Sequence, residues 1–378
     1  MTGDASAAIP LVTVVTPAYD VGRYIGEAVD SVLRQTFADF EYLVVDDGST
    51  DDTAKLVKVH GGDDPRLRLI QIVHSGVPAA RNTGIREARG KYIALLDGDD
   101  RWRPKFLERQ VSLIESLPPE VGMVFCRTRS ILDNGMLVKI HWQRAGSYDF
   151  DDFLVRNNPA GNGSAVLVRA SCFADAGDFD ESLPWAEDLD MWLRIAEHSK
   201  TPVSWGSRYF LVDRRLRAGA MTRDTTTGEA VLDKLLAAQA PRLRRYPAAE
   251  AYVRPALLAL KYGSDAKMAQ HWAATARSSG LGRLARSAAG RRLLVWAAMP
   301  ASGRRAVRRA QGLTRAAVKR ATSRLSFLRA GFLMGWRTAP RSESCLVGSR
   351  CLRYGSACAV AARGGGRRAL KVALERYS

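Results

Sequence analysis

Between residues 11 and 130 the hydrophobic positions follow two patterns in turn. Short apolar runs, typical of buried strands, alternate with stretches in which apolar residues recur every three or four positions, as in amphipathic helices. The predicted strands are residues 11–16, 42–45, 67–72, 92–96 and 121–126. The predicted helices are residues 24–33, 53–59, 78–88 and 104–117. Strands that alternate with helices predict a mainly parallel α/β sheet with right-handed crossovers.

The pattern is more mixed from residue 131 to 225, with helix signals at 150–156 and 189–197 and strand signals at 165–168 and 202–205. After about residue 228 the strand signals end, and the chain is predicted to form helices interrupted at Pro241, Pro247, Pro255, Gly280 and Pro300. We expect an N-terminal tail at 1–10, an α/β domain at 11–227, a basic helical extension at 228–338 and a flexible basic tail at 339–378.

The net charge of +18 is unevenly distributed along the chain. Residues 231–378 contain 30 Lys and Arg against 5 Asp and Glu, a net charge of +25. Residues 1–230 contain 27 Lys and Arg against 34 Asp and Glu, a net charge of −7. An acidic first part joined to a strongly basic second part indicates an anionic partner for the second part.

A composition of 46% hydrophobic and 25% charged residues is typical of a globular protein. We expect no membrane-spanning helix, because no apolar run approaches the ~20 residues that a span needs. Residues 1–10 lack the basic start and apolar core of a signal peptide. The five cysteines match neither a disulfide framework nor a usual zinc-ligand spacing, and they are Cys126, Cys172, Cys345, Cys351 and Cys358. These features predict a cytoplasmic protein.

Acidic residues follow two of the predicted strands. Asp46 and Asp47 end the second strand, and Asp97-Gly98-Asp99 ends the fourth. The carboxyl ends of parallel strands meet at one edge of a sheet, where ligands bind. Gly98 leaves room for a close approach, and two carboxylates on one side suit Mg²⁺ or Mn²⁺ with positions open for a diphosphate. An isolated Asp-x-Asp could instead be an acidic turn at the surface. Asp46 and Asp47 could instead belong to the cap of the next helix.

Two other segments favour a nucleotide. Pro17-Ala18-Tyr19 follows the first strand and could cradle and stack a flat base, unless it is an ordinary turn. Arg81 lies in the first turns of a predicted helix, whose amides together with the guanidinium favour an anion, unless Arg81 is a surface residue. The chain lacks a Gly-x-Gly-x-x-Gly after its first strand and a Gly-x₄-Gly-Lys-Ser/Thr, which argues against dinucleotide and P-loop sites.

Glu187 and Asp188 open a predicted helix after Trp185. One of these carboxylates could act as a general base on an attacking hydroxyl, and Trp185 could provide a stacking floor for a sugar ring. The alternative is a pair of helix-capping acids.

Seven segments of the chain occur in the order found in the family 2 glycosyltransferases, and together they make residues 13–221 resemble that family. The segments are Thr16–Asp20, Gln35–Phe37, Asp46–Ser49, Ala80–Gly84, Leu95–Asp100, Phe179–Glu181 and Glu187–Trp192. The resemblance implies a GT-A fold (Rossmann-like and mainly parallel) and an inverting glycosyltransferase for residues 11–227.

The resemblance also implies site roles. Tyr19 and Asp47 would hold the base of a nucleotide-diphospho-sugar, in a donor site completed by Pro17, Ala18, Asp20, Asp46, Arg81 and Gly98. Asp99 would bind Mn²⁺ or Mg²⁺ on the diphosphate, with Asp97 supporting the ribose or the metal. Asp188 would be the catalytic base, and Trp185 and Glu187 would contact the sugar or acceptor.

The sequence departs from the family pattern at one late segment. Many relatives carry Arg-x-His near the donor phosphates, whereas this chain has Arg214-Arg215-Leu216. Arg214 or Arg215 would substitute at the phosphates. The Gln-x-x-Arg-Trp motif of processive synthases is absent, which favours transfer of one sugar at a time to a glycan or polyprenyl-linked acceptor.

The basic second part has three interpretations. It is a helical subdomain with a solvated basic face, a peripheral membrane element, or a nucleic-acid-binding segment, for which no known binding fold is recognisable. Residues 304–332 place their apolar positions within an arc of about 100°, with arginines and lysines around the rest. Such a helix could lie on an anionic membrane surface and hold the protein at the inner face of the membrane.

Two other functions remain as alternatives. A catalytically silent GT-A-like protein would bind nucleotide-sugars, but it has no need of Asp97, Asp99 and Asp188 together. A nucleotidyltransferase would show a glycine-rich basic loop after the first strand, and Pro17–Asp20 is not one. The resemblance favours UDP as the nucleotide, with GDP and dTDP as alternatives.

Overall fold

A computed structural model describes residues 9–156, 158–198, 204–216, 225–262, 266–278 and 288–298 of the chain. All of these residues belong to one compact unit, Met1–Arg309. The expectations for the helix at 304–332, the tail at 339–378, Gly280, Pro300 and the cysteines Cys345, Cys351 and Cys358 lie outside the described residues.

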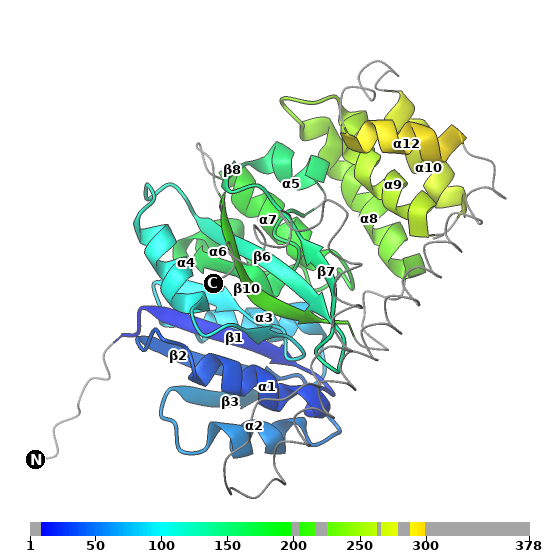
Figure 1. The fold of residues 1–378 in the computed structure, drawn as a ribbon. Helices are drawn as coiled ribbons and strands as arrows, with labels where there is room; N and C mark the ends of the chain where they lie inside the picture. The colour runs from blue at the N-terminus through cyan, green and yellow to red at the C-terminus, as the bar shows by residue number, and fades with distance from the viewer. Residues whose placement is uncertain are drawn as a thin grey trace, which may run out of the picture. The chain divides into compact units, whose positions relative to one another are not determined.

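The described residues form a ten-stranded sheet in the order β3-β2-β1-β4-β9-β6-β10-β5, with β7 paired to β6 and β8 paired to β10 (Figure 1). The strands are β1 Val12–Ala18, β2 Phe40–Asp46, β3 Leu67–Gln71, β4 Tyr92–Leu95, β5 Arg101–Trp102, β6 Met123–Ile131, β7 Leu137–His141, β8 Gly146–Tyr148, β9 Val166–Arg169 and β10 Ser204–Arg215. The first four strands pair in parallel, as the sequence predicts. β9 is antiparallel to both neighbours, β4 and β6, so the sheet is mixed but mostly parallel.

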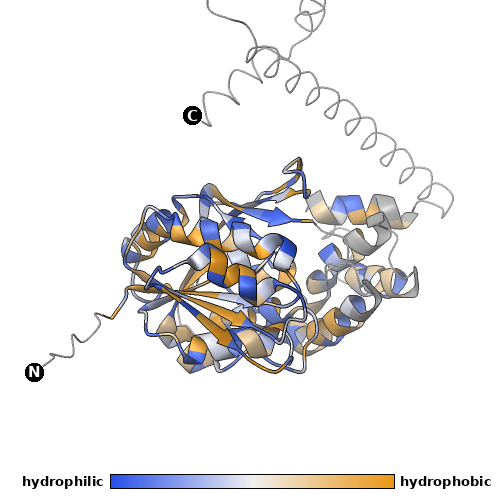
Figure 2. Cartoon of the chain, turned by 90° about the horizontal axis from the view of Figure 1, so that it is seen from below, coloured by the Kyte–Doolittle hydropathy of each residue, from blue (hydrophilic) through white to orange (hydrophobic). Residues whose placement is uncertain are grey.

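Two hydrophobic cores lie on the two faces of this sheet. The helices of the first part are α1 Gly22–Leu33, α2 Thr53–Gly61, α3 Val77–Arg86, α4 Phe106–Glu115, α5 Phe150–Arg156, α6 Ala170–Ala176 and α7 Glu187–His198. Residues of α1, α2 and α4 pack with Val12 and Val14 of β1 on one face. Residues of α3 and α5 to α7 pack with Val15 of β1 on the other. Successive side chains of β1 point to opposite faces of the sheet, so this fully buried strand contributes to both cores. The interior strands are mostly hydrophobic in Figure 2.

The described residues after 224 are helical, with α8 Thr225–Gln239, α9 Val253–Tyr262, α10 Ala266–Arg277 and α12 Ala288–Ala298. Backbone N–H groups of Arg244 and Arg245 donate to the carboxylate of Asp151 at 3.2 and 2.6 Å and anchor this part to α5. Pro255 does not interrupt a helix as expected but lies in the first turn of α9, where its missing N–H is tolerated. Within the described ranges, every helix is too short or too polar to cross a bilayer.

Sequence patterns missed three short strands, β5, β7 and β8, and the helix α6. They also missed most of β10, which runs over 12 residues, whereas the predicted strand at 202–205 overlaps only its first two. β10 is irregular beside Phe210, where its register with β6 shifts twice. Arg214 and Arg215 at its end pair with Ser130 and Ile131 of β6.

Candidate active site

The carboxyl ends of β1, β2 and β4 meet at one edge of the sheet. The register aligns Ala18 with Asp46 and Val15 with Leu95. A Cβ added to Gly98 would lie 3.2 Å from the carbonyl oxygen of Pro17, so glycine allows the segment after β4 to pack against the end of β1. The acidic segments of the sequence are therefore neighbours in space.

The segment after β4 presents three carboxylates to different surroundings. Asp100 is buried, and its carboxylate accepts hydrogen bonds from Asn162 Nδ2 at 2.8 Å, Ser164 Oγ at 2.7 Å and the Arg215 backbone N–H at 2.8 Å. Asp97 and Asp99 are partly exposed. Asp100 thus fixes the segment, while Asp97 and Asp99 remain accessible to a ligand.

The charge of this segment suits a cation. Burial and the nearby charges of Asp99 and Asp97 raise the pKa of Asp100 well above its usual range, against the opposing charge of Arg214. A hard divalent cation bound to carboxylate oxygens would relieve this repulsion. Among the described residues no three carboxylate, imidazole or thiol groups form a complete metal site. Asp97 and Asp99 could supply only part of a coordination shell, so a cation here would need its other ligands from a bound diphosphate or water.

Arg81 of α3 is a buried bridge between two carboxylates. Its Nη2 donates to Asp97 Oδ1 and its Nη1 to Glu187 Oε1, both at 2.8 Å, and it is only 3% exposed. Burial opposes the charge, but Asp97 and Glu187 raise the pKa of Arg81. A Cβ on Gly163 would lie 3.0 Å from Nη2, so the guanidinium is closely enclosed. Arg81 links the segment after β4 to the start of α7.

We expect Arg81→Met to lower the free energy of unfolding by about 3–5 kcal/mol, because it leaves the buried carboxylate of Glu187 and the partly exposed one of Asp97 without their buried partner. Urea unfolding of the full chain measures this loss. Arg86→Met is the matched control, because Arg86 pairs with Asp178 on the surface, both more than half exposed, and should cost at most about 1 kcal/mol. Equal losses in the two variants would contradict a structural role for the buried pairs.

Asp188 lies in the first turn of α7, next to a strained residue. Ala186 has φ 62°, a left-handed conformation that is unfavourable for alanine. The Asp188 carboxylate accepts from Asn158 Nδ2 at 2.9 Å and from the Leu189 backbone N–H at 2.7 Å. Burial and the charge of Glu187 raise the pKa of Asp188 to about 6, with Arg81 opposing them. Such a value suits a general base at neutral pH.

A polar loop, residues 158–164, donates hydrogen bonds to both Asp188 and Asp100. Sequence patterns did not predict this role. Asn158 donates to Asp188, and Asn162 and Ser164 donate to Asp100. Ser164 Oγ also accepts from the Asp97 backbone N–H at 3.0 Å. The only available signal was the composition of this loop, Asn-Pro-Ala-Gly-Asn-Gly-Ser, which indicates a turn but not its partners.

The expected base-binding residues lie around the end of β2. Asp47 is buried, and its carboxylate accepts from the backbone N–H groups of Ser75 at 2.7 Å and Gly76 at 2.9 Å, just before α3. His74 Nδ1 lies 2.9 Å from the same carboxylate, and its ring stacks on Tyr19 with centroids 3.9 Å apart. The sequence predicted that the backbone amides at the start of α3 would favour an anion. In the structure the carboxylate of Asp47 accepts from the amides just before this helix. His74 was not predicted, because no motif marks it.

Asp46 and Asp20 hold the loops of this region. Asp46 is buried and accepts from the Ser49 backbone N–H and Gln71 Nε2, both at 3.1 Å. Asp20 has φ 46°, and its carboxylate accepts from the Thr50 backbone N–H at 2.8 Å. In the described structure both carboxylates are used within the protein.

The two arginines at the end of β10 differ in their surroundings. Arg215 is buried, donates from Nη2 to Glu27 at 2.8 Å and from Nε to the Asp99 carbonyl at 3.2 Å, and lies over the Tyr24 ring. Arg214 is partly exposed, and its charge acts on Asp100 and on His141. Arg214 is therefore the accessible cation beside the acidic segment.

Trp185 and Glu187 are both engaged within the protein. A Cβ on Gly228 of α8 would lie 2.9 Å from Cε2 of Trp185, so the indole packs closely on that helix. Glu187 is buried and paired with Arg81. Their contacts with a sugar or acceptor stay a prediction.

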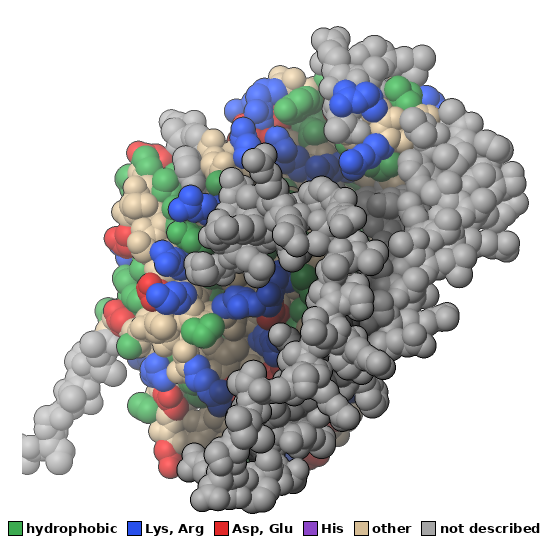
Figure 3. Space-filling view, viewed as in Figure 1, with side chains coloured by type: hydrophobic (Ala, Val, Ile, Leu, Met, Phe, Trp, Pro, Cys, Tyr) green, Lys and Arg blue, Asp and Glu red, His purple; other side chains and the backbone are tan. Residues whose placement is uncertain are grey.

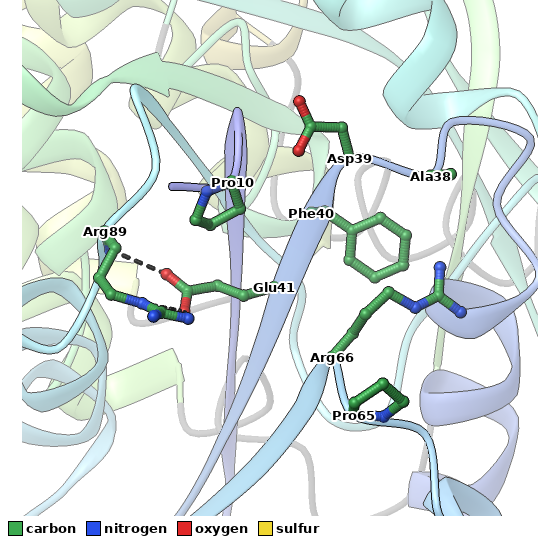
Figure 4. A pocket seen from close by; sticks show the side chains of 8 residues that line it. All are labelled: Pro10, Ala38, Asp39, Phe40, Glu41, Pro65, Arg66 and Arg89. Atoms are coloured by element: carbon green, nitrogen blue, oxygen red, sulfur yellow. Dashed lines mark hydrogen bonds and ion pairs between the residues drawn. The ribbon is translucent and has the colours of Figure 1, made fainter. Parts of the chain in front are cut away.

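A separate cavity of about 270 Å³ lies at the opposite, amino ends of β1 to β4. Figure 4 shows its lining residues, Pro10, Ala38, Asp39, Phe40, Glu41, Pro65, Arg66 and Arg89. Arg89 pairs with Glu41 at 2.7 Å, and Arg66 pairs with Asp64 while lying over the Phe40 ring. Its arginines are thus already paired, and it does not contribute to the acidic edge.

Comparison with known proteins finds a family model, curated relatives and solved structures that are similar to this chain. The family model for "Glycosyl transferase family 2" matches residues 13–175. A chondroitin synthase of Pasteurella multocida (strain Pm70) is 32% identical over 197 residues, covering 51% of this chain and 19% of that protein. The uncharacterized glycosyltransferase EpsJ of Bacillus subtilis (strain 168) is 45% identical over 92 residues, covering 24% of this chain and 27% of that protein. The chain thus spans about a fifth to a quarter of the length of these relatives.

Two solved structures share the fold. S. aureus TarS 1-349 in complex with UDP-GlcNAc matches with a TM-score of 0.56 and 16% identity, covering 80% of this chain and 92% of that one. The mannosyltransferase PcManGT from Pyrobaculum calidifontis, in complex with GDP-Man and Mn²⁺, matches with a TM-score of 0.51 and 22% identity, covering 82% and 86%. These likenesses confirm the GT-A fold that the sequence predicts.

Proposed function

We propose that the chain, whose residues 13–175 match the model for glycosyl transferase family 2, transfers one sugar from a nucleotide-diphospho-sugar to an acceptor hydroxyl with inversion. The observation that carries this proposal is the placement of Asp97 and Asp188 on either side of buried Arg81. Arg81 bridges Asp97 to Glu187, the residue before Asp188, and the charge of Asp97 acts on the pKa of Asp188. Asp97, as a cation ligand, and Asp188, as a base with a raised pKa, would thus lie next to the same reacting sugar.

The donor would bind along the carboxyl edge of β1, β2 and β4. Tyr19, Asp47 and the newly found His74 would contact the base, with Pro17, Ala18 and the loops held by Asp20 and Asp46 around it. Asp99 and Asp97 would hold Mn²⁺ or Mg²⁺, which would neutralise the negative charge of the leaving diphosphate. Arg214, accessible beside this segment, would pair with the phosphates. UDP is the proposed nucleotide.

The transfer itself would be a single displacement. The Asp188 carboxylate takes the proton of the acceptor hydroxyl, and that oxygen forms a bond to the anomeric carbon. The bond from the anomeric carbon to the diphosphate oxygen breaks on the opposite face, and the nucleotide diphosphate leaves. One displacement inverts the anomeric configuration without a covalent sugar intermediate on the protein.

The proposed acceptor is a glycan or a polyprenyl-linked sugar, used at the cytoplasmic face of the membrane. The support for a membrane-side acceptor is the charge of +25 in residues 231–378, which would be attracted to anionic headgroups. The expected role of the helix at 304–332 concerns residues outside the described structure and stays a prediction.

Calorimetric titration of UDP, GDP and dTDP, each with Mn²⁺ and then with EDTA, tests the donor site. We expect one nucleotide to bind tightly and only with the metal. If none of the three bound to the folded protein, the transferase proposal would be wrong.

We expect Asn158→Gly to raise the pKa of the catalytic base above about 6 and to shift the acidic limb of the kcat/KM profile to higher pH. The amide of Asn158 donates to the ionised form of Asp188, and its loss favours the protonated form. The groups that still act on Asp188 are Glu187, Asp97, Arg81 and the Leu189 backbone N–H. If the pKa rises by about one unit, activity should fall about fivefold at pH 6, where half of the wild-type base is ionised, and should recover at high pH.

Glycine is the informative replacement, because Asn158 has φ 55° and glycine adopts this conformation without strain. Asn162→Ala is the matched control in the same loop, since Asn162 donates to Asp100 and not to Asp188. A loss of activity that is equal at every pH would indicate a merely structural role for Asn158.

A further inference from the structure

An exposed group of aromatic rings and arginines lies where β10 bulges beside β6. We call it the arginine–aromatic surface, and it consists of Arg109, Arg127, Trp142, Arg208, Tyr209 and Phe210. Trp142 is 61% exposed and Tyr209 37% exposed, which is high for such large rings. Figure 3 shows Lys and Arg side chains gathered on the face over β6 and β10.

The rings and guanidinium groups of this surface are packed against one another. The guanidinium of Arg127 lies 4.5 Å from the Trp142 ring centre, and the Trp142 and Phe210 rings meet edge to face at 5.1 Å. Arg109 and Arg208 lie 4.8 and 5.6 Å from the centre of the Tyr209 ring. The aromatic residues are therefore held in exposed positions by cation–π contacts rather than left mobile.

The charge of Arg127 is not neutralised within the described part of the chain. Arg127 donates to the carbonyl oxygens of Gln143 and Arg208 at 3.1 Å each, and no carboxylate there forms an ion pair with it or with Arg208. Arg129, two residues along the same strand, does pair with Asp213. The surface thus combines apolar rings with uncompensated positive charge.

We propose that the arginine–aromatic surface docks the catalytic domain on an anionic lipid membrane. Trp and Tyr rings, apolar with a polar tip, favour the membrane interface, and arginines favour anionic headgroups. Leu137 and Val138, each 48% exposed, are further apolar residues on the neighbouring strand β7. Arg127 covers one face of Trp142, which favours insertion of the ring into lipid over stacking on a nucleic-acid base.

The position of the surface suits this role. β10 continues from Phe210 to Arg214 beside the acidic segment, a rise of about 13 Å along the strand. Docking would therefore bring the candidate active site close to the bilayer. This consequence, but not the docking itself, rests on the proposed transfer to a lipid-linked acceptor.

The test is co-sedimentation of the full chain with vesicles of phosphatidylcholine, alone or mixed with an equal part of phosphatidylglycerol. Trp142→Ala/Tyr209→Ala and Arg127→Gln/Arg208→Gln should each lower the partition onto the mixed vesicles about tenfold or more. Val59→Ala/Arg34→Gln is the matched control, since Val59 is exposed on α2 and Arg34 is exposed directly after α1, and it should bind like wild type. The basic residues 231–378 are present in every variant, so the ratio to wild type isolates the surface.

If both double variants bound the vesicles as tightly as the control, the docking proposal would be overturned. It would also be overturned if they lost affinity for single-stranded oligo(dT) but not for the mixed vesicles. Circular dichroism of the same samples verifies the fold, and nucleotide calorimetry tests the transferase proposal separately. If a double variant failed to fold, the exposed single change Arg208→Gln would decide the question, with a loss of about fivefold expected.

Discussion

Asp188→Asn should lower kcat by about 10²- to 10⁴-fold while leaving nucleotide affinity almost unchanged. The amide is nearly isosteric but cannot accept the proton of the attacking hydroxyl. Because the donor would bind on the far side of Arg81, its contacts should survive the change. Single-turnover transfer from the labelled donor measures the chemical step, and calorimetry measures nucleotide binding.

Asp190→Asn is the matched control for this change. Asp190 lies on the same helix and pairs with Arg194 at 2.8 Å, so its replacement should alter kcat by no more than about threefold. Since the pKa of Asp188 is raised to about 6, the wild-type base loses its charge as the pH falls through that value, and kcat/KM should decline below it. The decline should be absent from the residual activity of Asp188→Asn. Full kcat in that variant would assign the base to another residue.

We expect Asp99→Ala to weaken metal-dependent nucleotide binding by about 100-fold or more. This exceeds the usual 10–100-fold effect of residues that only support a metal ligand. The alanine would remove a proposed ligand, while Asp100 would still anchor the segment through Asn162 and Ser164. Titration of the nucleotide with Mn²⁺ measures the change, and the weak binding left in EDTA should be similar in both proteins.

Asp178→Ala serves as the control for a lost carboxylate, because Asp178 is exposed and pairs with Arg86 at the surface. Its Mn²⁺-dependent nucleotide affinity should stay within about twofold of wild type. If Asp99→Ala also kept its affinity, the cation would not be held by this segment.

The sequence was most informative where function depends on the ends of regular strands. Buried β1, β2 and β4 are short apolar runs, and each is followed by polar or acidic residues, so the edge that collects Asp47, Asp97 and Asp99 could be predicted. The parallel pairing that brings these ends together follows from the helices between the strands.

The sequence could not predict the contacts that hold the site, because they join distant residues in irregular segments. Asn162 and Ser164 lie 62 and 64 residues from Asp100, and Arg215 lies 115 residues from it. His74 lies in a loop without periodicity, and its stacking on Tyr19 depends on how that loop folds back. A buried Arg81 was also not expected, because burial of an arginine is decided by its two carboxylate partners rather than by local pattern.

The left-handed backbone at Ala186 has a consequence for laboratory evolution. Alanine in this conformation costs on the order of 1 kcal/mol or more, and glycine would remove the cost. Selection for heat resistance alone should therefore favour Ala186→Gly. The same change would loosen the chain just before Asp188, so a heat-resistant Ala186→Gly protein should turn over more slowly, a direct case of stability traded against activity.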